Sequence, residues 1–144
     1  MSAAMEPGWI VVRNTGGFRT EITAGAHAMV ADEPATVGGT DAGPTPYDYL
    51  LAAIGGCTAM TVRMYAMRKS WPLDEVVVRM KQGRSHEADC ERCETMPVGI
   101  DHIDRQVELI GALTDEQRTK LLSIADRCPV KQAIGRGIEV HGLI

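Results

Sequence analysis

Of the four cysteines of this 144-residue chain, one lies within a segment that the sequence predicts to be helical and one lies where a predicted helix ends. Cys57 follows Gly55 and Gly56 within a long apolar run, and Cys128 immediately precedes Pro129. A cysteine thiol becomes a nucleophile and a redox group when it loses its proton. A buried cysteine also serves as a small apolar side chain. The sequence therefore marks Cys57 and Cys128 as candidates for thiol chemistry and leaves a structural role open for each.

The other two cysteines form a Cys-x-x-Cys pair, Cys90 and Cys93, with His86 before it. Thiolate and imidazole are ligands that zinc prefers in proteins, and Glu94 or His102 would serve as the fourth ligand. A single Cys-x-x-Cys without a second pair is a weak metal signal, so bound zinc is not favoured. A second redox pair and a solvent-exposed loop are the alternatives.

A charged group near Cys57 would be needed to stabilise its thiolate, because the middle of a helix lacks the positive end of the helix dipole. Asp48 lies at the third helical position, where an acidic residue also stabilises the start of a helix. The residues between them turn through about 900°, which puts Asp48 and Cys57 on opposite faces of a straight helix. Contact across a dimer or in a bent helix stays open. Arginines are candidate cations, and four qualify from the sequence: Arg19, Arg13, Arg63 and Arg136.

Three short segments near the start of the chain predict an antiparallel meander: Ile10–Arg13, Arg19–Thr23 and His27–Ala31. Asn14–Gly17 and Ala24–Gly25 are turn sequences between them. A loop rich in Gly, Pro, Thr and Asp follows, over Asp32–Gly43. The meander and this loop therefore precede the helix that carries Cys57.

Thr45 predicts the N-cap of that helix, Pro46 its first residue, and the helical pattern continues to about Arg68. Its middle, Leu50–Val62, is apolar or small all round, which predicts burial on every side. A helix of this length spans about 33 Å. A chain of this size can hardly cover such a helix alone, so we infer a two-fold dimer.

Two further strands are predicted by partial alternation, over Glu75–Gln82 and Ile103–Leu109. Thr114 and Gln117 match a capping box that opens a helix to about Arg127. Four residues form the apolar side of this helix: Leu121, Leu122, Ile124 and Ala125.

Pro129 disfavours helix at Cys128, so the preceding helix is expected to end there. The same proline predicts the start of a short helix through Ile134. Ile138–Val140 predicts a final strand. The order of strands, helix, strands, helix and strand indicates an α+β fold in a single domain, residues 1–144.

The composition argues against several classes of protein. A net charge of −4 and an aromatic fraction of 4% are unlike a nucleic-acid-binding surface. The longest uncharged run, Tyr49–Val62, has 14 residues and is too short to cross a bilayer. Met1–Trp9 has neither a basic end nor an apolar stretch, so we expect no signal peptide and a cytoplasmic location. In that compartment, reactive or metal-binding cysteines are favoured over structural disulfides.

Two motifs resemble those of the OsmC/Ohr family. The run Gly43–Met60, GPTPYDYLLAAIGGCTAM, is similar to the family's central helix with its first cysteine. The run Ala125–Val130, ADRCPV, is similar to the family's second cysteine motif. The resemblance extends over nearly the whole chain, and the order and separation of the two motifs make it specific.

The resemblance implies an α+β fold with antiparallel sheets, assembled as an intertwined homodimer with two long central helices and active sites at the subunit interface. It also implies a thiol peroxidase that reduces organic hydroperoxides in the oxidative stress response. Cys57 would be the peroxidatic and Cys128 the resolving cysteine, with a small dithiol as reductant and no metal, flavin or haem. A glutamate and an arginine activate the first thiol in the family, and Asp48 and Arg19 are their best matches here.

The chain departs from the family pattern at three points. Tyr47 directly follows the proline, where the acidic residue is common, and Asp48 comes one position later. Thr58 stands where many members have an aromatic residue after the first cysteine. The Cys90–Cys93 pair is an addition. These differences indicate a divergent branch and leave a second function open, a metal- or small-ligand-binding module that uses this pair and His86.

Overall fold

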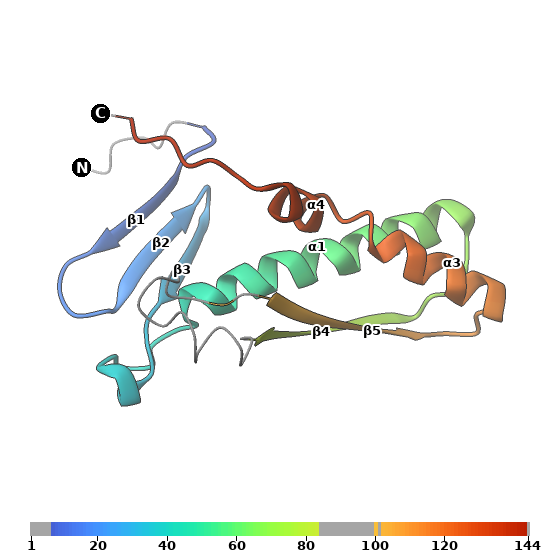
Figure 1. Cartoon of the computed structure of the whole chain (residues 1–144), viewed down its shortest axis with the longest axis horizontal. Helices are drawn as coiled ribbons and strands as arrows, with labels where there is room; N and C mark the ends of the chain where they lie inside the picture. The colour runs from blue at the N-terminus through green and yellow to red at the C-terminus, as the bar shows by residue number, and fades with distance from the viewer. Residues whose placement is uncertain (1–6, 84–99, 101, 144) are drawn as a thin grey trace, which may run out of the picture. The chain divides into compact units, whose positions relative to one another are not determined.

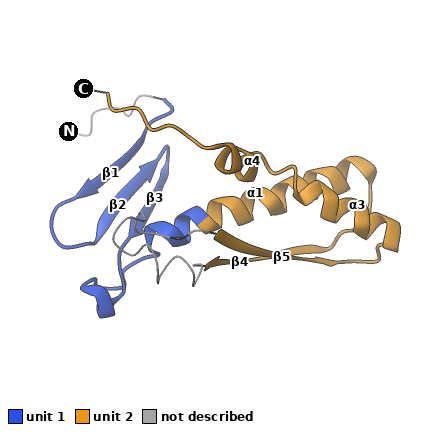
Figure 2. Cartoon of the chain, viewed as in Figure 1, with its two compact units in different colours: residues 1–50 blue, residues 51–144 orange. Residues whose placement is uncertain are grey.

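The computed structural model describes residues 7–83, 100 and 102–143, and it divides into two compact units, Met1–Leu50 and Leu51–Ile144 (Figure 2). Each unit contains its own antiparallel sheet, and helices follow both sheets in the chain (Figure 1). The predicted α+β class is therefore confirmed.

The first unit contains the predicted meander of β1 (Ile10–Asn14), β2 (Thr20–Ala24) and β3 (His27–Ala31), paired in that order. The two outer strands both pair antiparallel with β2. Gly17 and Gly25 lie in the two connecting turns with φ of 59° and 58°. Glycine adopts this left-handed conformation without the steric cost that a side chain adds. The turns therefore lie where the sequence predicts them, and strand ends shift by one residue.

The loop after β3 is organised around the carboxylate of Asp32, which is only 2% exposed. It accepts hydrogen bonds from the Thr40 hydroxyl at 2.5 Å and from the N–H groups of Glu33 at 2.8 Å and Ala42 at 3.2 Å. A single turn of 3-10 helix, η1 (Ala35–Val37), lies within this loop. The polar segment that the sequence predicts as a loop is thus held together by hydrogen bonds to one buried carboxylate.

Acid should weaken this loop. The hydrogen bond from Thr40 outweighs the opposing effect of burial and, with the N–H groups, lowers the pKa of Asp32 from 3.8 to about 2. A carboxyl whose pKa is lower in the folded chain stabilises it above the unfolded pKa, and that stabilisation disappears as pH falls from about 4 to about 2. Asp32→Asn should therefore lower the urea midpoint at neutral pH and flatten its fall over this pH range. The exposed Asp41→Asn in the same loop is the matched control, and an unchanged acid profile in Asp32→Asn would contradict this account.

The second unit pairs β4 (Glu75–Gly83) with β5 (His102–Ile110), antiparallel, with Val76 opposite Leu109. After β5 come α3 (Asp115–Ala125) and α4 (Pro129–Arg136). The predicted capping box opens α3: Gln117 N–H donates to the Thr114 hydroxyl at 3.1 Å, and Thr114 N–H donates to the Gln117 side chain at 3.0 Å. α3 ends before the predicted Arg127, because the residues preceding Pro129 form a turn.

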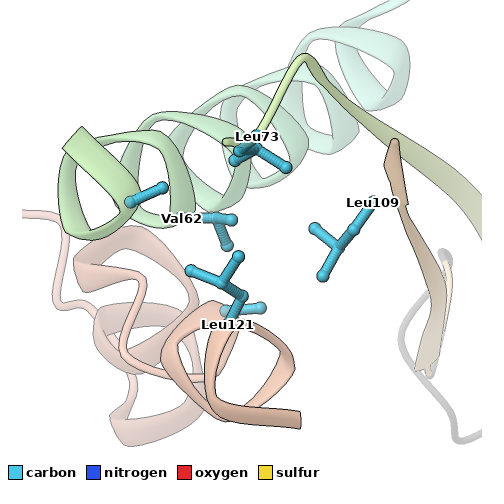
Figure 3. Packing of buried hydrophobic residues seen from close by; sticks show 6 residues of the cluster. Val62, Leu73, Leu109 and Leu121 are labelled. Atoms are coloured by element: carbon cyan, nitrogen blue, oxygen red, sulfur yellow. The ribbon is translucent and has the colours of Figure 1, made fainter. Parts of the chain in front are cut away.

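The core of this unit lies between α1 (Pro46–Lys69), α3 and the β4–β5 sheet (Figure 3). Six buried residues form it: Val62, Ala66, Leu73, Leu109, Leu121 and Ala125. Leu121, Ile124 and Ala125 are buried as predicted, whereas Leu122 is 45% exposed. The prediction for Leu122 was wrong, because one helical step from Leu121 turns its side chain away from the core.

Only one face of α1 is buried in the described chain, through Leu51, Ile54, Thr58 and three further residues. Burial on every side, as predicted, does not occur within one chain. Gly55 lies against the sheet, since a Cβ there would come within 3.1 Å of Met80 Cγ, whereas nothing described lies within 4 Å of a Cβ at Gly56. The absence of a side chain at Gly55 therefore allows a β4 side chain to approach α1 closely one turn from Thr58.

By length and composition α1 also passes as a membrane span, with a mean hydropathy of 1.3 and 33% of its most apolar window buried in the chain. The uncharged run Tyr49–Val62 alone predicts a segment too short to cross a bilayer, whereas the whole helix is long enough by this criterion. The core helix of a soluble protein meets the same criterion, and α1 supplies Val62 and Ala66 to the core.

The predicted final strand, Ile138–Val140, is wrong. These residues are extended after α4 but form no strand, and Ile138 and Val140 are exposed. A strand needs a hydrogen-bonded neighbour, and in the part of the chain that the structure describes no strand pairs with this segment.

Candidate active site

The side chains of Cys57 and Cys128 meet in the second unit. Cys57 lies midway along α1 and is half-buried, and Cys128 is the N-cap of α4 and is fully buried. The Cys57 side chain lies close enough to the Cys128 sulfur to lower the pKa of the Cys128 thiol. The structure thus brings together two residues whose contact the sequence could not show. Two thiols in contact can be joined as a disulfide by a two-electron oxidation.

Pro129 explains why Cys128 occupies the start of a helix. Proline at the first helical position disfavours helix in the residue before it, and Cys128 has an extended backbone with φ −54° and ψ 118°. Its sulfur therefore faces the unpaired N–H groups of the first turn, and Lys131 N–H donates to it at 3.5 Å. The Cys128 thiol is also within 3.8 Å of the Ile54 carbonyl oxygen in α1.

The environment of Cys128 favours its thiolate. Burial alone raises the pKa of the Cys128 thiol, but hydrogen bonds from Cys57, the Lys131 N–H and Thr58 more than offset burial and hold the pKa below its ordinary value of 9.0. These donors stabilise negative charge on sulfur, as at other helix N-termini. Cys128 is therefore prepared to carry charge within a buried site.

An ionic cluster holds the turn that carries Cys128. Asp126 accepts from Arg105 of β5 at 2.7 Å and from the Lys131 ammonium at 3.1 Å. Arg105 also donates to the Ala125 carbonyl at the end of α3, at 3.1 Å. The bonds from Lys131 and then Arg105 lower the pKa of Asp126 below its ordinary value. The sequence analysis did not predict a role for these residues at the site. The charged residues flanking Cys128 in the second motif could have indicated one.

Thr58 is a second residue that the sequence interpretation missed as part of the site. Its side chain is fully buried, its hydroxyl donates to the Ile54 carbonyl at 2.8 Å, and it lies close enough to Cys128 to lower the pKa of that thiol. The sequence signal was its position directly after Cys57, where it departs from the pattern of the resembling family.

Asp48 and Arg19, the predicted activating groups, belong to the first unit. Asp48 forms a capping box at the start of α1, accepting from Thr45 N–H at 2.9 Å and donating its own N–H to the Thr45 hydroxyl at 3.1 Å. The structure therefore confirms that Asp48 stabilises the start of the helix. Arg19 pairs with Glu21 at 3.2 Å, and both side chains are exposed. The role of either residue at Cys57 stays a prediction.

The candidate zinc ligands His86, Cys90, Cys93 and Glu94 lie outside the described residues. His102 begins β5. Within residues 7–83, 100 and 102–143, no group of three or more His, Cys, Asp or Glu side chains is placed to hold a metal ion. The zinc hypothesis therefore stays a prediction.

A cavity of about 460 Å³ lies in the first unit. Its apolar wall comes mainly from the meander and the start of α1, and includes Val12, Phe18, Ile22 and Tyr49. The Tyr49 hydroxyl donates to the Val30 carbonyl at 2.7 Å, which ties α1 to β3 within this unit. The cavity contains neither Cys57 nor Cys128.

Comparisons with known proteins find structures with a similar fold. An OsmC-like protein of Mycoplasma pneumoniae is 16% identical over 81% of this chain and 79% of its own, with a TM-score of 0.64. Organic hydroperoxide resistance proteins of Legionella pneumophila and Elizabethkingia anophelis are 18% and 20% identical, with TM-scores of 0.61 and 0.56. The Legionella match covers 90% of this chain and 91% of that protein, and the Elizabethkingia match covers 92% and 89%. These identities show a shared fold.

No protein of curated function matches the sequence. The model of the OsmC-like protein family matches residues 39–141, a range that includes the helix of Cys57 and the turn of Cys128. That match spans well over half of the chain, so the protein belongs to the OsmC family.

Proposed function

We propose that this protein is a thiol peroxidase that reduces organic hydroperoxides with Cys57 and Cys128. The observation that carries the proposal is the proximity of the two thiols, one half-buried and one fully buried, with Cys57 near enough to lower the pKa of Cys128. The names of family neighbours as organic hydroperoxide resistance proteins support the choice of substrate. The half-buried Cys57 is the thiol that a peroxide can reach.

The first step is attack by the Cys57 thiolate on the terminal oxygen of the hydroperoxide. The O–O bond breaks, the alkoxide takes a proton and leaves as an alcohol, and Cys57 becomes a sulfenic acid. Sulfur is oxidised by two electrons and the peroxide is reduced by two. In the second step the Cys128 thiolate attacks the Cys57 sulfur, expels its hydroxyl as water after protonation, and forms the Cys57–Cys128 disulfide.

A small dithiol closes the cycle by thiol–disulfide exchange, which returns both cysteines to thiols and oxidises the dithiol. Every step uses sulfur chemistry alone. Such a cycle requires a reducing compartment, so we place the protein in the cytoplasm.

Arg19 and Asp48 complete the proposal as the groups that activate Cys57. Arg19 is held only by an exposed ion pair with Glu21, and such pairs contribute about 0–1 kcal/mol. Its guanidinium can therefore leave that contact at little cost. Asp48 would orient this arginine while retaining its bond to Thr45 N–H.

The proposal is tested by following hydroperoxide loss with a dithiol as the reductant. The wild-type protein should consume tert-butyl hydroperoxide catalytically, and hydrogen peroxide more slowly, because the apolar and small residues that flank Cys57 in α1 favour an organic substituent. Hydroperoxide loss no faster than in buffer with the dithiol alone would contradict the proposal.

We further propose that two copies of the chain form the working unit, joined through the outward face of α1. This face carries Met60, Met64 and Met67, of which Met60 and Met67 are 74% and 70% exposed. Gly56 lies one turn before Met60, and no described atom comes within 4 Å of a Cβ placed there. Exposed apolar side chains gathered on one helix face are typical of a protein interface.

A charge on this face should separate the copies. Met60→Glu removes no contact in the core, but in a dimer it would bury a carboxylate without a partner, which is strongly unfavourable. In sedimentation equilibrium the wild type should show twice the chain mass of 15.6 kDa, and Met60→Glu should raise the dissociation constant at least about tenfold. Thr119→Glu, which adds the same charge at an exposed position of α3, is the matched control. A wild-type protein sedimenting at 15.6 kDa would refute the dimer.

A further inference from the structure

The two sulfurs of the candidate site differ in access and in surroundings. Cys128 is fully buried, whereas Cys57 is half-buried. Around Cys128 the structure supplies hydrogen-bond donors from two elements, the Lys131 N–H of α4 and the Thr58 hydroxyl of α1. Once the two cysteines are joined as a disulfide, this asymmetry decides which sulfur a reducing thiol attacks and which sulfur leaves.

Thr58 contributes the adjustable part of this environment. Its hydroxyl has one proton, which it donates to the Ile54 carbonyl at 2.8 Å, and the Cys128 thiol faces the same carbonyl at 3.8 Å. A thiolate on Cys128 has no proton to donate and accepts hydrogen bonds instead. The Thr58 hydroxyl can then turn from the Ile54 carbonyl to the Cys128 sulfur. The carbonyl keeps the backbone hydrogen bond that it receives within the helix.

We propose that Thr58 stabilises the Cys128 sulfur as it leaves, so that a reducing thiol opens the Cys57–Cys128 disulfide by attacking Cys57. This proposal rests on the proposed two-cysteine cycle and adds the direction of its reductive half. The attacking thiolate forms a bond to the Cys57 sulfur, and the S–S bond breaks with its electron pair on Cys128. The second thiol of the dithiol then displaces Cys57, so that the dithiol is oxidised and both cysteines are reduced.

The contacts of Cys128 support this direction independently of access. The Lys131 N–H donates to its sulfur at 3.5 Å, and a sulfur whose negative charge is stabilised in this way leaves faster in thiol–disulfide exchange. Lys131 N–H is a backbone group that no side-chain substitution removes. Thr58 is therefore the donor through which the proposal can be tested.

The test measures how fast a dithiol opens the disulfide in four proteins: the wild type, Thr58→Val, Thr58→Ser and Thr61→Val. Valine keeps the shape of threonine and removes the hydroxyl. Thr61 is the matched control, because its hydroxyl donates to the Cys57 carbonyl at 2.7 Å, the same kind of bond one turn along α1. The disulfide is formed with diamide, so the experiment does not depend on peroxide chemistry. Acid quenching, alkylation and mass spectrometry then follow the open form.

We expect Thr58→Val to open roughly threefold more slowly, because it loses one hydrogen bond to the leaving sulfur. Thr58→Ser and Thr61→Val should open at the wild-type rate. The Cys128 thiolate, seen as the difference in ultraviolet absorbance from Cys128→Ser, should form at higher pH in Thr58→Val and at unchanged pH in Thr61→Val. Equal opening rates for Thr58→Val and Thr61→Val would overturn the role of Thr58.

The site of attack is read separately with glutathione as a monothiol probe. Acid quenching and peptide mapping of the oxidised wild type should find the glutathione adduct on Cys57. An adduct on Cys128 would overturn the proposal while leaving the peroxidase cycle intact. A disulfide that forms with diamide but not with hydroperoxide would contradict the proposed function alone. A protein in which neither oxidant joins Cys57 to Cys128 would overturn both.

Discussion

Cys57→Ser should abolish catalytic hydroperoxide consumption, leaving the rate measured with the dithiol alone. A serine hydroxyl has nearly the shape of the thiol but is a far weaker nucleophile toward a peroxide oxygen, because it stays protonated near neutral pH. Cys57 is the half-buried member of the pair, and Cys128 is fully buried and cannot replace it. The measurement is the loss of tert-butyl hydroperoxide with excess dithiol, at equal concentrations of wild-type and variant protein.

The matched control replaces the other two cysteines. A Cys90→Ser, Cys93→Ser double variant removes the two thiols that could form a second redox pair. It should keep the wild-type rate. Loss of activity in this control, with retention in Cys57→Ser, would move the peroxidatic role to the Cys90–Cys93 pair. Circular dichroism of each variant checks that the helices are retained.

Cys128→Ser should react with the first equivalent of hydroperoxide but should not sustain turnover at the wild-type rate. The Cys57 thiol is intact, so its oxidation to sulfenic acid still occurs, but no neighbouring thiol condenses with it. With excess hydroperoxide the sulfenic acid should advance to sulfinic acid, which a dithiol does not reduce. Sustained turnover should fall at least about tenfold, since the dithiol must then act on the sulfenic acid directly.

Mass spectrometry of Cys57 after repeated exposure distinguishes the outcomes for Cys128→Ser. The variant should gain two oxygen atoms on Cys57, whereas the wild type should show the Cys57–Cys128 disulfide instead. Unchanged steady-state turnover in Cys128→Ser, without sulfinic acid on Cys57, would show that Cys128 does not resolve the sulfenic acid.

Local sequence signals located most of the elements. Pro46 and the Thr114–Gln117 capping box predict helix starts that the structure confirms. The turns at Gly17 and Gly25 also lie where these glycines predict them. Such signals act within a few residues, so they can be interpreted from sequence alone. The final strand at Ile138–Val140 failed because alternation indicates a strand only where a neighbouring strand is available.

The candidate site was harder to predict because it depends on contacts between distant segments. Cys57 and Cys128 were both singled out, but their meeting depends on how α4 packs against α1. Thr58 was noted only as a departure from a family pattern, since nothing local reveals that it lies near Cys128. Arg105 lies in a strand far from the cysteine motifs and shows its role only through its bond to Asp126. Long-range partners of this kind carry no periodic signal.

One measurement tests the central claim most directly, the disulfide map of the fully reduced protein after one equivalent of organic hydroperoxide. The sample is quenched with acid, the free thiols are alkylated, and the peptides are identified by mass spectrometry. The account predicts that the hydroperoxide is consumed and that a single bond joins Cys57 to Cys128, with Cys90 and Cys93 alkylated. A bond between Cys90 and Cys93 alone, or four free thiols with the hydroperoxide unconsumed, would contradict it.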